Sequence, residues 1–339
     1  KGGVPARFGG RSASVLDIKM IEPNTEHFKM QGGIGLVSNR VMAEIPIIKE
    51  KLSVLVAGWV SFNDFLFKLV APNNLKNIRA NFMDLATKIY YRPNNKNTIS
   101  FSNYYSYDYY RVDSLFSLEN VVAKRTNFDY GHQNFAVHWN HYFSPKLSMM
   151  LSATTTLYNT KTYAPDTVNT INLTSSIDYK SLHASFDYIP NETHKLNFGG
   201  SITRYDIKPG TLNDGIVSRV SRVYLPDEHS MEAGIYADEE WKMSEKFTLQ
   251  AGIRYSHYWQ IGEGTVNQYA SNQMPSLNSI VSKKQYGSGE VMASYGGFEP
   301  RVTMKYSIGK DATMKFGYNR MQQFFQLLSN NTTPLPTSR

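Results

Sequence analysis

Residues 228–258 read EHSMEAGIYADEEWKMSEKFTLQAGIRYSHY. Two runs in which apolar and polar residues alternate flank the short polar stretch Ser244–Lys246. The second run has an apolar face formed by Leu249, Ala251, Ile253 and Tyr255. Its other face is polar and is formed by Thr248, Gln250, Gly252, Arg254 and Ser256. A period of two is typical of β-strands, so this stretch predicts an antiparallel hairpin closed by a tight turn.

The same arrangement repeats along the chain. Short polar turns follow long β-type runs at Lys49–Glu50, Asn94–Asn97, Ser144–Lys146, Asn191–His194, Ser244–Lys246 and Gly309–Asp311. The alternate connections are long and aromatic, and lie at 63–80, 108–126, 161–169, 208–228 and 262–295. Segregation of short turns from long loops is typical of a transmembrane β-barrel, because the two kinds of connection lie on opposite sides of the membrane.

The runs correspond to about thirteen strands. Their ranges are 26–37, 40–48, 52–62, 81–93, 98–111, 127–143, 147–160, 170–189, 195–207, 229–242, 247–261, 296–308 and 312–325. Bacterial single-chain barrels have an even number of strands. We therefore expect an all-β fold, a transmembrane antiparallel β-barrel of which this sequence contains only a part.

Aromatic residues support this interpretation. One set of rings lies just before the tight turns, at Tyr90, Tyr91, Phe143, Tyr188, Trp241 and Tyr306. A second set follows the same turns at Trp59, Tyr105, Tyr158, Tyr205, Tyr255, Tyr258 and Tyr318. A tilted strand crosses the hydrocarbon core in about 9–11 residues, and amphipathic rings prefer its two edges. The two sets predict two aromatic girdles; aromatic pairs across a water-soluble sheet are the alternative.

Composition narrows the possible functions. The chain has no Cys, which excludes disulfides and thiolate chemistry. Charged residues make up 19%, below the usual value of about a quarter, and aromatic residues make up 13%; both values favour a barrel. The net charge of +8 is scattered, which favours a solvated or anionic-lipid-facing surface over nucleic acid. His138 and His141 point to opposite faces of a strand and do not predict a metal site. No catalytic motif occurs, so we expect no enzyme activity and no cofactor.

Three further stretches resemble a known family. Residues 5–18 read PARFGGRSASVLDI, residues 32–64 read GGIGLVSNRVMAEIPIIKEKLSVLVAGWVSFND, and residues 316–338 read FGYNRMQQFFQLLSNNTTPLPTS. The first resembles the last strand of the plug domain in TonB-dependent outer-membrane receptors of the Bacteroidetes type. The others, with the hairpin quoted above, resemble barrel strands of that family. The resemblance implies the C-terminal end of a plug at 1–22 and a partial barrel at 23–339.

The resemblance also implies a function. A complete receptor would have about 22 strands around a plug and would import a nutrient or metal chelate. TonB would act from the periplasm on plug residues that precede this segment. A signal peptide would also precede it. Its other partners would be outer-membrane lipids and, in a larger assembly, a surface lipoprotein or other subunits. The alternatives are a receptor-like barrel that docks partners in an outer-membrane complex, and a soluble all-β carbohydrate-binding protein.

Two groups of residues are candidate sites within this reading. The plug–barrel contact is predicted at Arg7, Gly9, Gly10, Arg11, Glu232, Glu240 and Glu299. We expect the arginines to pair with carboxylates of the barrel wall; hydrated charges in the lumen are the alternative. The long loop 262–295 suggests a ligand surface through Tyr269, Tyr286 and Tyr295, because polar aromatic loops bind sugars, peptides or chelated iron. A loop that only shields the barrel mouth is the alternative.

Overall fold

The computed structural model describes residues 4–10, 15–61, 69, 78–112, 115–118, 121–123, 125–165, 170–214, 223–274, 276–309 and 312–324. Nearly all regular structure in these residues is β-strand, and a short 3-10 turn, η1, spans Leu277–Ser279. No helix within the described ranges has the length and apolar character needed to cross a membrane.

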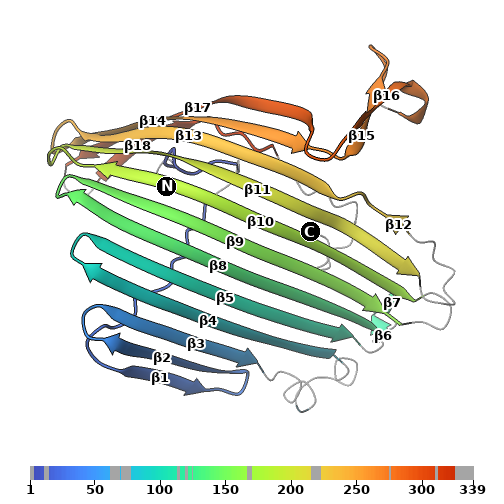
Figure 1. Ribbon diagram of the computed structural model, residues 1–339, viewed down its shortest axis with the longest axis horizontal. Helices are drawn as coiled ribbons and strands as arrows, with labels where there is room; N and C mark the ends of the chain where they lie inside the picture. Colours follow the sequence, from blue (N-terminus) through green and yellow to red (C-terminus); the bar gives the residue numbers. More distant parts are fainter. Residues whose placement is uncertain are drawn as a thin grey trace. The chain divides into compact units, whose positions relative to one another are not determined.

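The main sheet is antiparallel, and its strand order is β1-β2-β3-β4-β5-β8-β9-β10-β11-β13-β14-β17-β18, with β12 paired to β11 (Figure 1). The first strands are β1 (Lys29–Ile34), β2 (Ser38–Ile48), β3 (Leu52–Ser61), β4 (Ile78–Asn94), β5 (Asn97–Val112), β8 (Thr126–Ser144) and β9 (Leu147–Ala164). The later strands are β10 (Ile171–Tyr188), β11 (His194–Asp214), β12 (Val223–Tyr224), β13 (Glu228–Lys242), β14 (Phe247–Ile261), β17 (Val291–Ile308) and β18 (Ala312–Asn319). The prediction of an all-β antiparallel fold is confirmed.

The chain divides into two compact units. The first unit holds residues 4–10, the last third of β10 from His183, β11 up to Asp206, and β13 to β18. The second unit holds β1 to β9, the first two thirds of β10, the end of β11 from Ile207, and β12. The two units are described separately below.

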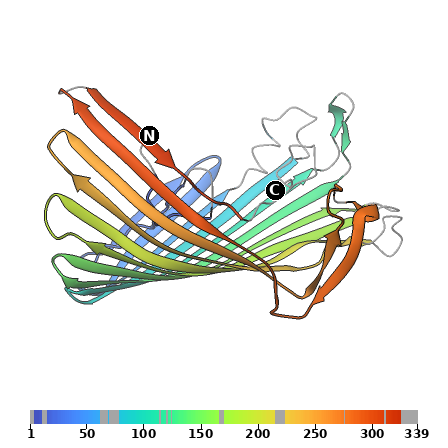
Figure 2. The ribbon, with the colours of Figure 1, turned by 90° about the horizontal axis from the view of Figure 1, so that it is seen from above.

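The tight turns are shaped by their first side chains. In the turn between β13 and β14, the Ser244 Oγ accepts the backbone N–H of Phe247 at 3.1 Å. Ser144 does the same for Leu147 at 3.2 Å, and the Asn191 Oδ1 accepts from His194 at 3.0 Å. Asn and Ser favour such turns because a short polar side chain replaces the missing ladder partner. Figure 2 shows the turns β13–β14 and β17–β18 at one end of their unit.

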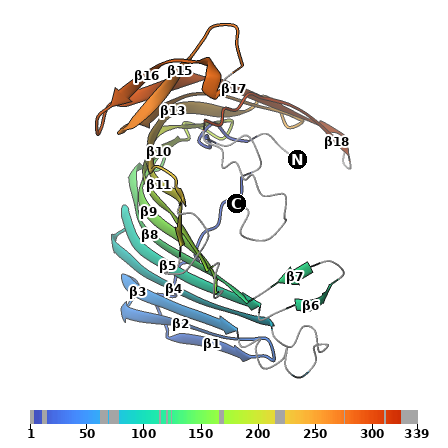
Figure 3. The ribbon, with the colours of Figure 1, turned by 90° about the vertical axis from the view of Figure 1, so that its right-hand side faces the viewer.

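The strands differ from the prediction mainly at their outer ends. The predicted loop 262–295 contains a separate hairpin of β15 (Gly264–Tyr269) and β16 (Ile280–Tyr286), which extends past the end of β14 (Figures 2 and 3). The predicted loop 108–126 contains the small pair β6 (Leu115–Leu118) and β7 (Val121–Ala123). Both were missed because these strands are short, from three to seven residues, and alternation over so few residues does not predict a strand. The end strands β1 and β18 are shorter than predicted, since each pairs on one side only.

The faces of the first unit are inverted relative to a water-soluble sheet. On β17, Glu299 is 0% exposed and Arg301 is 3% exposed, whereas the intervening apolar face carries Phe298 at 58%. On β14, Arg254 is 3% exposed and its neighbour Ile253 is 49% exposed. Buried charges and exposed apolar side chains are the pattern of a sheet with one face toward lipid. We call the apolar face the outer face and the opposite one the inner face.

Candidate functional site

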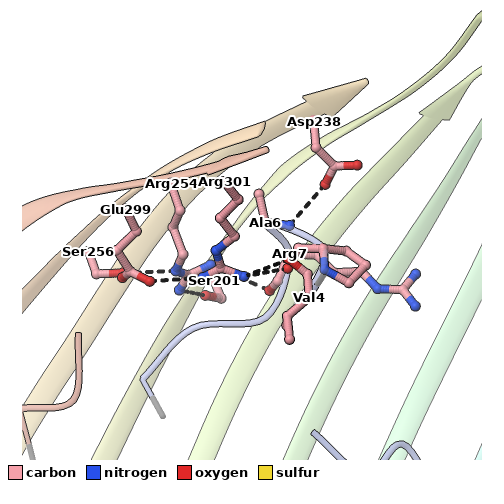
Figure 4. A network of polar contacts seen from close by, with 10 residues as sticks. Val4, Ala6, Arg7, Ser201, Asp238, Arg254, Ser256, Glu299 and Arg301 are labelled. Carbon is pink, nitrogen blue, oxygen red and sulfur yellow. Dashed lines mark hydrogen bonds and ion pairs between the residues drawn. The ribbon is translucent and has the colours of Figure 1, made fainter. Parts of the chain in front are cut away.

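The N-terminal segment, residues 4–10, lies against the inner face of β13, β14 and β17 within the first unit (Figure 4). The Arg301 Nη1 donates to the carbonyl of Pro5 at 2.5 Å and to that of Val4 at 3.4 Å. The Arg254 Nη1 donates to the carbonyl of Arg7 at 3.5 Å. The sheet thus holds the segment by its backbone, through arginine side chains.

A further hydrogen bond runs in the other direction, with the segment as donor and the sheet as acceptor. The backbone N–H of Ala6 donates to the Asp238 Oδ2 on β13 at 3.2 Å. Ala6 is 1% exposed, so its N–H would have no water partner if the carboxylate were absent. The wall therefore presents donors and an acceptor that match successive backbone groups of the segment.

The arginines are held rigidly by a buried network (Figure 4). The Arg301 Nη2 lies 2.8 Å from the Glu299 Oε2, and the Ser256 Oγ donates to the Glu299 Oε1 at 2.7 Å. The Arg254 Nε donates to the Ser256 Oγ at 2.8 Å, and its Nη2 donates to the Ser201 Oγ at 3.2 Å. A buried charge needs a counter-charge and hydrogen bonds, and this network supplies both.

Strand register brings the network together. Arg254 is opposite Glu299 in the β14–β17 ladder, and Gly252 is opposite Arg301. Alternate residues share a face, so both charged residues of β17 and Arg254 lie on the inner face. Opposite charges directly across a ladder stabilise the pairing. A Cβ built on Gly252 would lie 2.6 Å from the Asp238 Cβ and 3.1 Å from the Ala6 Cβ, so the missing side chain leaves room for the N-terminal segment.

Glycines allow the close approach of the segment. A Cβ built on Gly10, whose φ is +73°, would lie 2.6 Å from the Glu232 Oε1, closer than real Cβ contacts. A Cβ on Gly9 would overlap the Arg254 guanidinium, at 2.1 Å from its Nε. Gly10 adopts its positive φ without strain because it is glycine, and Gly9 leaves the Arg254 guanidinium undisturbed because it has no Cβ.

The predicted contact residues are placed as follows. Arg7 contributes its carbonyl, whereas its guanidinium carbon lies 4.7 Å from the centre of the Phe8 ring. Among the described residues, no salt bridge joins Arg7 to Glu232, Glu240 or Glu299. Glu299 pairs with Arg301 on its own strand, Glu240 is half-buried opposite Gln250, and Arg11 lies outside the described residues.

Sequence reasoning did not select Arg254 and Arg301 as contact residues. The available signal was two arginines at inner-face positions of adjacent strands, next to an inner-face glutamate. Ionisable residues inside a membrane-spanning structure are rarely without a partner or a role. The register that places them under the N-terminal segment was not readable from the pattern.

The predicted ligand tyrosines are spread over the end of the first unit. Tyr269 ends β15 and Tyr286 ends β16, but they pair with Ile280 and Gly264 at opposite ends of the hairpin. Tyr295 is exposed on β17, opposite Tyr258. The structure therefore does not bring Tyr269 and Tyr286 together. In the part of the chain that the structure describes, no group of three or more His, Cys, Asp or Glu is arranged to hold a metal ion.

A sheet with buried inner-face charges, an apolar outer face and short turns at one end defines the wall of a transmembrane β-barrel. Residues 60–338 match the family described as TonB dependent receptor-like, beta-barrel. The match spans most of the chain, so the chain belongs to this family, whose members are outer-membrane transport receptors. No curated protein matches the sequence.

Solved structures share the fold at low identity. The ferric-catecholate import receptor Fiu from E. coli K12 is 11% identical with a TM-score of 0.57, and the match covers 89% of this chain and 56% of that chain. The alcaligin outer-membrane receptor FauA from Bordetella pertussis is 12% identical (TM-score 0.58; 89% and 45%). The hemophore receptor HasR of Serratia marcescens, in complex with its hemophore HasA and heme, is 11% identical (TM-score 0.57; 86% and 44%). The chain spans about half the length of these receptors.

Proposed function

We propose that this chain is part of an outer-membrane receptor that imports a nutrient or metal chelate with energy delivered by TonB. In this proposal, residues 1–22 are the C-terminal end of a plug and residues 23–339 are part of a barrel of the Bacteroidetes type. The family match supports the receptor class. The partners would be TonB, outer-membrane lipids and, in a larger assembly, a surface lipoprotein.

The observation that carries the proposal is the backbone contact between the N-terminal segment and the inner face. Transport through a plugged barrel requires a contact that holds the plug at rest and yields under force. Arg254 and Arg301 would hold the segment by neutral carbonyls, so these contacts can yield without breaking an ion pair. Glu299 and Ser256 would act as positioning residues that keep the guanidiniums oriented.

The remaining predicted contact residues fit specific roles in this proposal. Gly9 and Gly10 would permit the close approach to Arg254 and Glu232. Arg7 would contact the wall through its carbonyl, and Glu240 would add negative charge to the inner face.

The extracellular side would bind the substrate. Tyr269, Tyr286 and Tyr295 lie on or beside the β15–β16 hairpin, which we assign to the substrate-facing end of the barrel. The solved relatives are named as receptors for a ferric catecholate, for alcaligin and for a heme-loaded hemophore. A metal chelate is therefore the substrate class that we favour.

Depletion of the growth medium tests the proposal. Cells with the full-length protein, cells without it and cells without TonB are grown in one defined medium, and small molecules in the spent media are compared by mass spectrometry. We expect at least one chelate or nutrient to be consumed only by cells that hold both proteins. Identical media from all three strains would refute import.

A docking role is the second candidate. The β15–β16 hairpin extends past the end of β14 and exposes Met274 and Val281, as a surface that contacts another protein would do. HasR binds a protein ligand, its hemophore. Purification of the native complex separates the two roles: a stoichiometric protein partner together with unchanged media favours docking.

A further inference from the structure

A cavity of about 480 Å³ lies in the second unit, over strands β5, β8, β9, β10 and the end of β11. Its lining combines apolar surface with polar and charged groups, and includes Tyr107, Asp129, Leu157, Lys161, Ser176 and Lys208. No residue assigned above to the plug contact or to the ligand surface contributes to it.

The first question is which face of the sheet the cavity occupies. On β4, Lys88 donates from Nζ to the carbonyl of Met20 at 3.1 Å, so even-numbered residues of β4 form the inner face. The odd-numbered face of β4 carries exposed Leu85 and Ile89. Ladder register passes this parity from Leu85 through Tyr105 and Gln133 to Leu157 on β9. Odd-numbered residues of β5, β8 and β9 therefore form the outer face.

Lys161, Tyr107 and Asp129 have this outer-face parity. On β10 the parity changes, because the inner-face Thr160 hydroxyl lies 2.5 Å from the Ser175 hydroxyl, which leaves Ser176 on the outer face. On β11, Tyr205 and Ile207 are buried and Lys208 is exposed. Most of the lining has outer-face parity, whereas His132, Thr160 and Ser175 contribute from inner-face positions, so the cavity opens mainly on the outer face, the side that meets lipid.

The second question is the depth of the cavity. Leu157 is the last apolar outer-face residue of β9 before the polar positions Asn159 and Lys161, and it lies ten residues after Leu147, where the strand begins. A strand crosses the hydrocarbon core in about 9–11 residues. Lys161 therefore lies just beyond the core, at the level of lipid headgroups, with Leu157 at the acyl boundary. Lys208 is fourteen residues after His194 and reaches the same level.

The chemistry of the lining selects an anion. Lys161 and Lys208 supply two cations, while Asn159, Thr174 and Ser176 supply hydrogen-bond donors. The Asp129 carboxylate accepts the Tyr107 hydroxyl at 2.7 Å and lies directly opposite Lys161 in the β8–β9 ladder, so two lysines and one carboxylate leave the lining with an excess of one positive charge. Farther along the same face, Arg79 and Arg111 are directly opposite each other and add positive potential. Two lysines, with hydroxyl and amide groups above an apolar floor, match a phosphate attached to acyl chains.

We propose that this cavity binds the phosphate headgroup of an anionic lipid from the outer leaflet of the outer membrane. The proposal rests on the outer-membrane location proposed above but is independent of transport. A bound lipid would insert its acyl chains beside Leu157 and place its phosphate between Lys161 and Lys208.

Retention of lipid by the purified protein provides the test. The full-length protein is extracted in mild detergent, separated from free lipid by gel filtration, and assayed for lipid phosphorus per mole of protein. The test variant is Lys161→Ala/Lys208→Ala. The matched control is Lys283→Ala/Lys284→Ala on β16, which removes the same charge away from the cavity. We expect the wild type and the control to retain lipid and the test variant to lose it.

Affinity is then measured by titration with phosphatidylglycerol, phosphatidylcholine and inorganic phosphate. Each basic residue near an anionic lipid surface contributes about a factor of five in affinity, so the test variant should bind phosphatidylglycerol about 30-fold more weakly. Equal binding by the test variant and the wild type would overturn the proposal. Tighter binding of inorganic phosphate than of phosphatidylglycerol would also overturn it, in favour of a free-anion site.

Heat-modifiable migration on gels confirms that each variant is folded. If the double variant does not fold, Lys161→Gln alone should lower the affinity about five-fold. Lipid retention without any consumed solute would leave this site intact and refute only the import function. Solute consumption by a receptor that never retains lipid would refute the lipid site and leave the import function intact.

Discussion

The buried pair of Arg301 and Glu299 makes a quantitative prediction. In Arg301→Met, the Glu299 carboxylate stays 0% exposed and loses the guanidinium that lay 2.8 Å away. Removing one partner of a buried ion pair typically destabilises a protein by about 3–5 kcal/mol. The Ser256 hydroxyl still donates to Glu299, so we expect a loss near about 3 kcal/mol, the lower end of that range.

A second substitution separates the wall from the segment. Arg301→Met/Glu299→Gln removes both charges of the pair and leaves the buried Arg254 with Glu232 as its carboxylate, so the double variant should recover only part of the lost stability, about 1–2 kcal/mol. It does not restore the donors to the carbonyls of Val4 and Pro5. Stability should therefore recover, whereas the contact with the N-terminal segment should stay weakened.

Two assays on the full-length protein measure these effects. Stability is followed by the urea dependence of folded and unfolded bands on gels. The segment is followed by maleimide labelling of Ala6→Cys, since these 339 residues contain no Cys and Ala6 is 1% exposed. Labelling should be slow in the parent and faster in both Arg301 variants. Glu299→Gln is also measured alone. The reasoning is refuted if the stability losses of Arg301→Met and Glu299→Gln simply add up to that of the double variant, or if labelling does not change.

Other predictions concern the segment and the outer face. Gly10→Ala should speed the same labelling, because a φ of +73° strains alanine by about 1–2 kcal/mol and its Cβ would displace the Glu232 carboxylate; unchanged labelling would show that the segment approaches the wall differently. Asp238→Ala should also speed the labelling of Ala6→Cys, because the hydrogen bond from the Ala6 N–H is lost. Asp238→Asn keeps an acceptor and should have a smaller effect. Ile253 lies near the middle of the outer face of β14, so Ile253→Arg should destabilise folding in bilayers by about 2–4 kcal/mol, measured by the same gel assay. Thr248→Arg on the inner face is the control, and equal losses in the two variants would contradict the assignment of faces.

Most of the main sheet could be predicted because its signals are local. Each predicted strand corresponds to a strand of the main sheet, since alternation depends only on neighbouring residues. The turns at Ser144, Asn191 and Ser244 are built by hydrogen bonds within four residues. The β15–β16 hairpin was missed because both of its faces are polar and no apolar period marks it.

The contact of the N-terminal segment was only partly within reach of the sequence. Gly9 and Gly10 form a local glycine pair that permits close approach, and they were selected as contact residues. Arg254 and Arg301 carry no local signal that separates them from other charged inner-face residues. Their role depends on the register of β14 and β17 and on a segment nearly 250 residues earlier in the chain.

The sequence by itself therefore determined the fold class, the strand ladder and the two faces, because alternation and turn chemistry act over a few residues. The tertiary structure alone decided how the N-terminal segment is held and where Lys161 and Lys208 meet around one cavity. The physical reason is that ladder register sets which distant side chains share a face and a level. A shift by one residue would exchange the inner and outer faces without changing the pattern along any single strand.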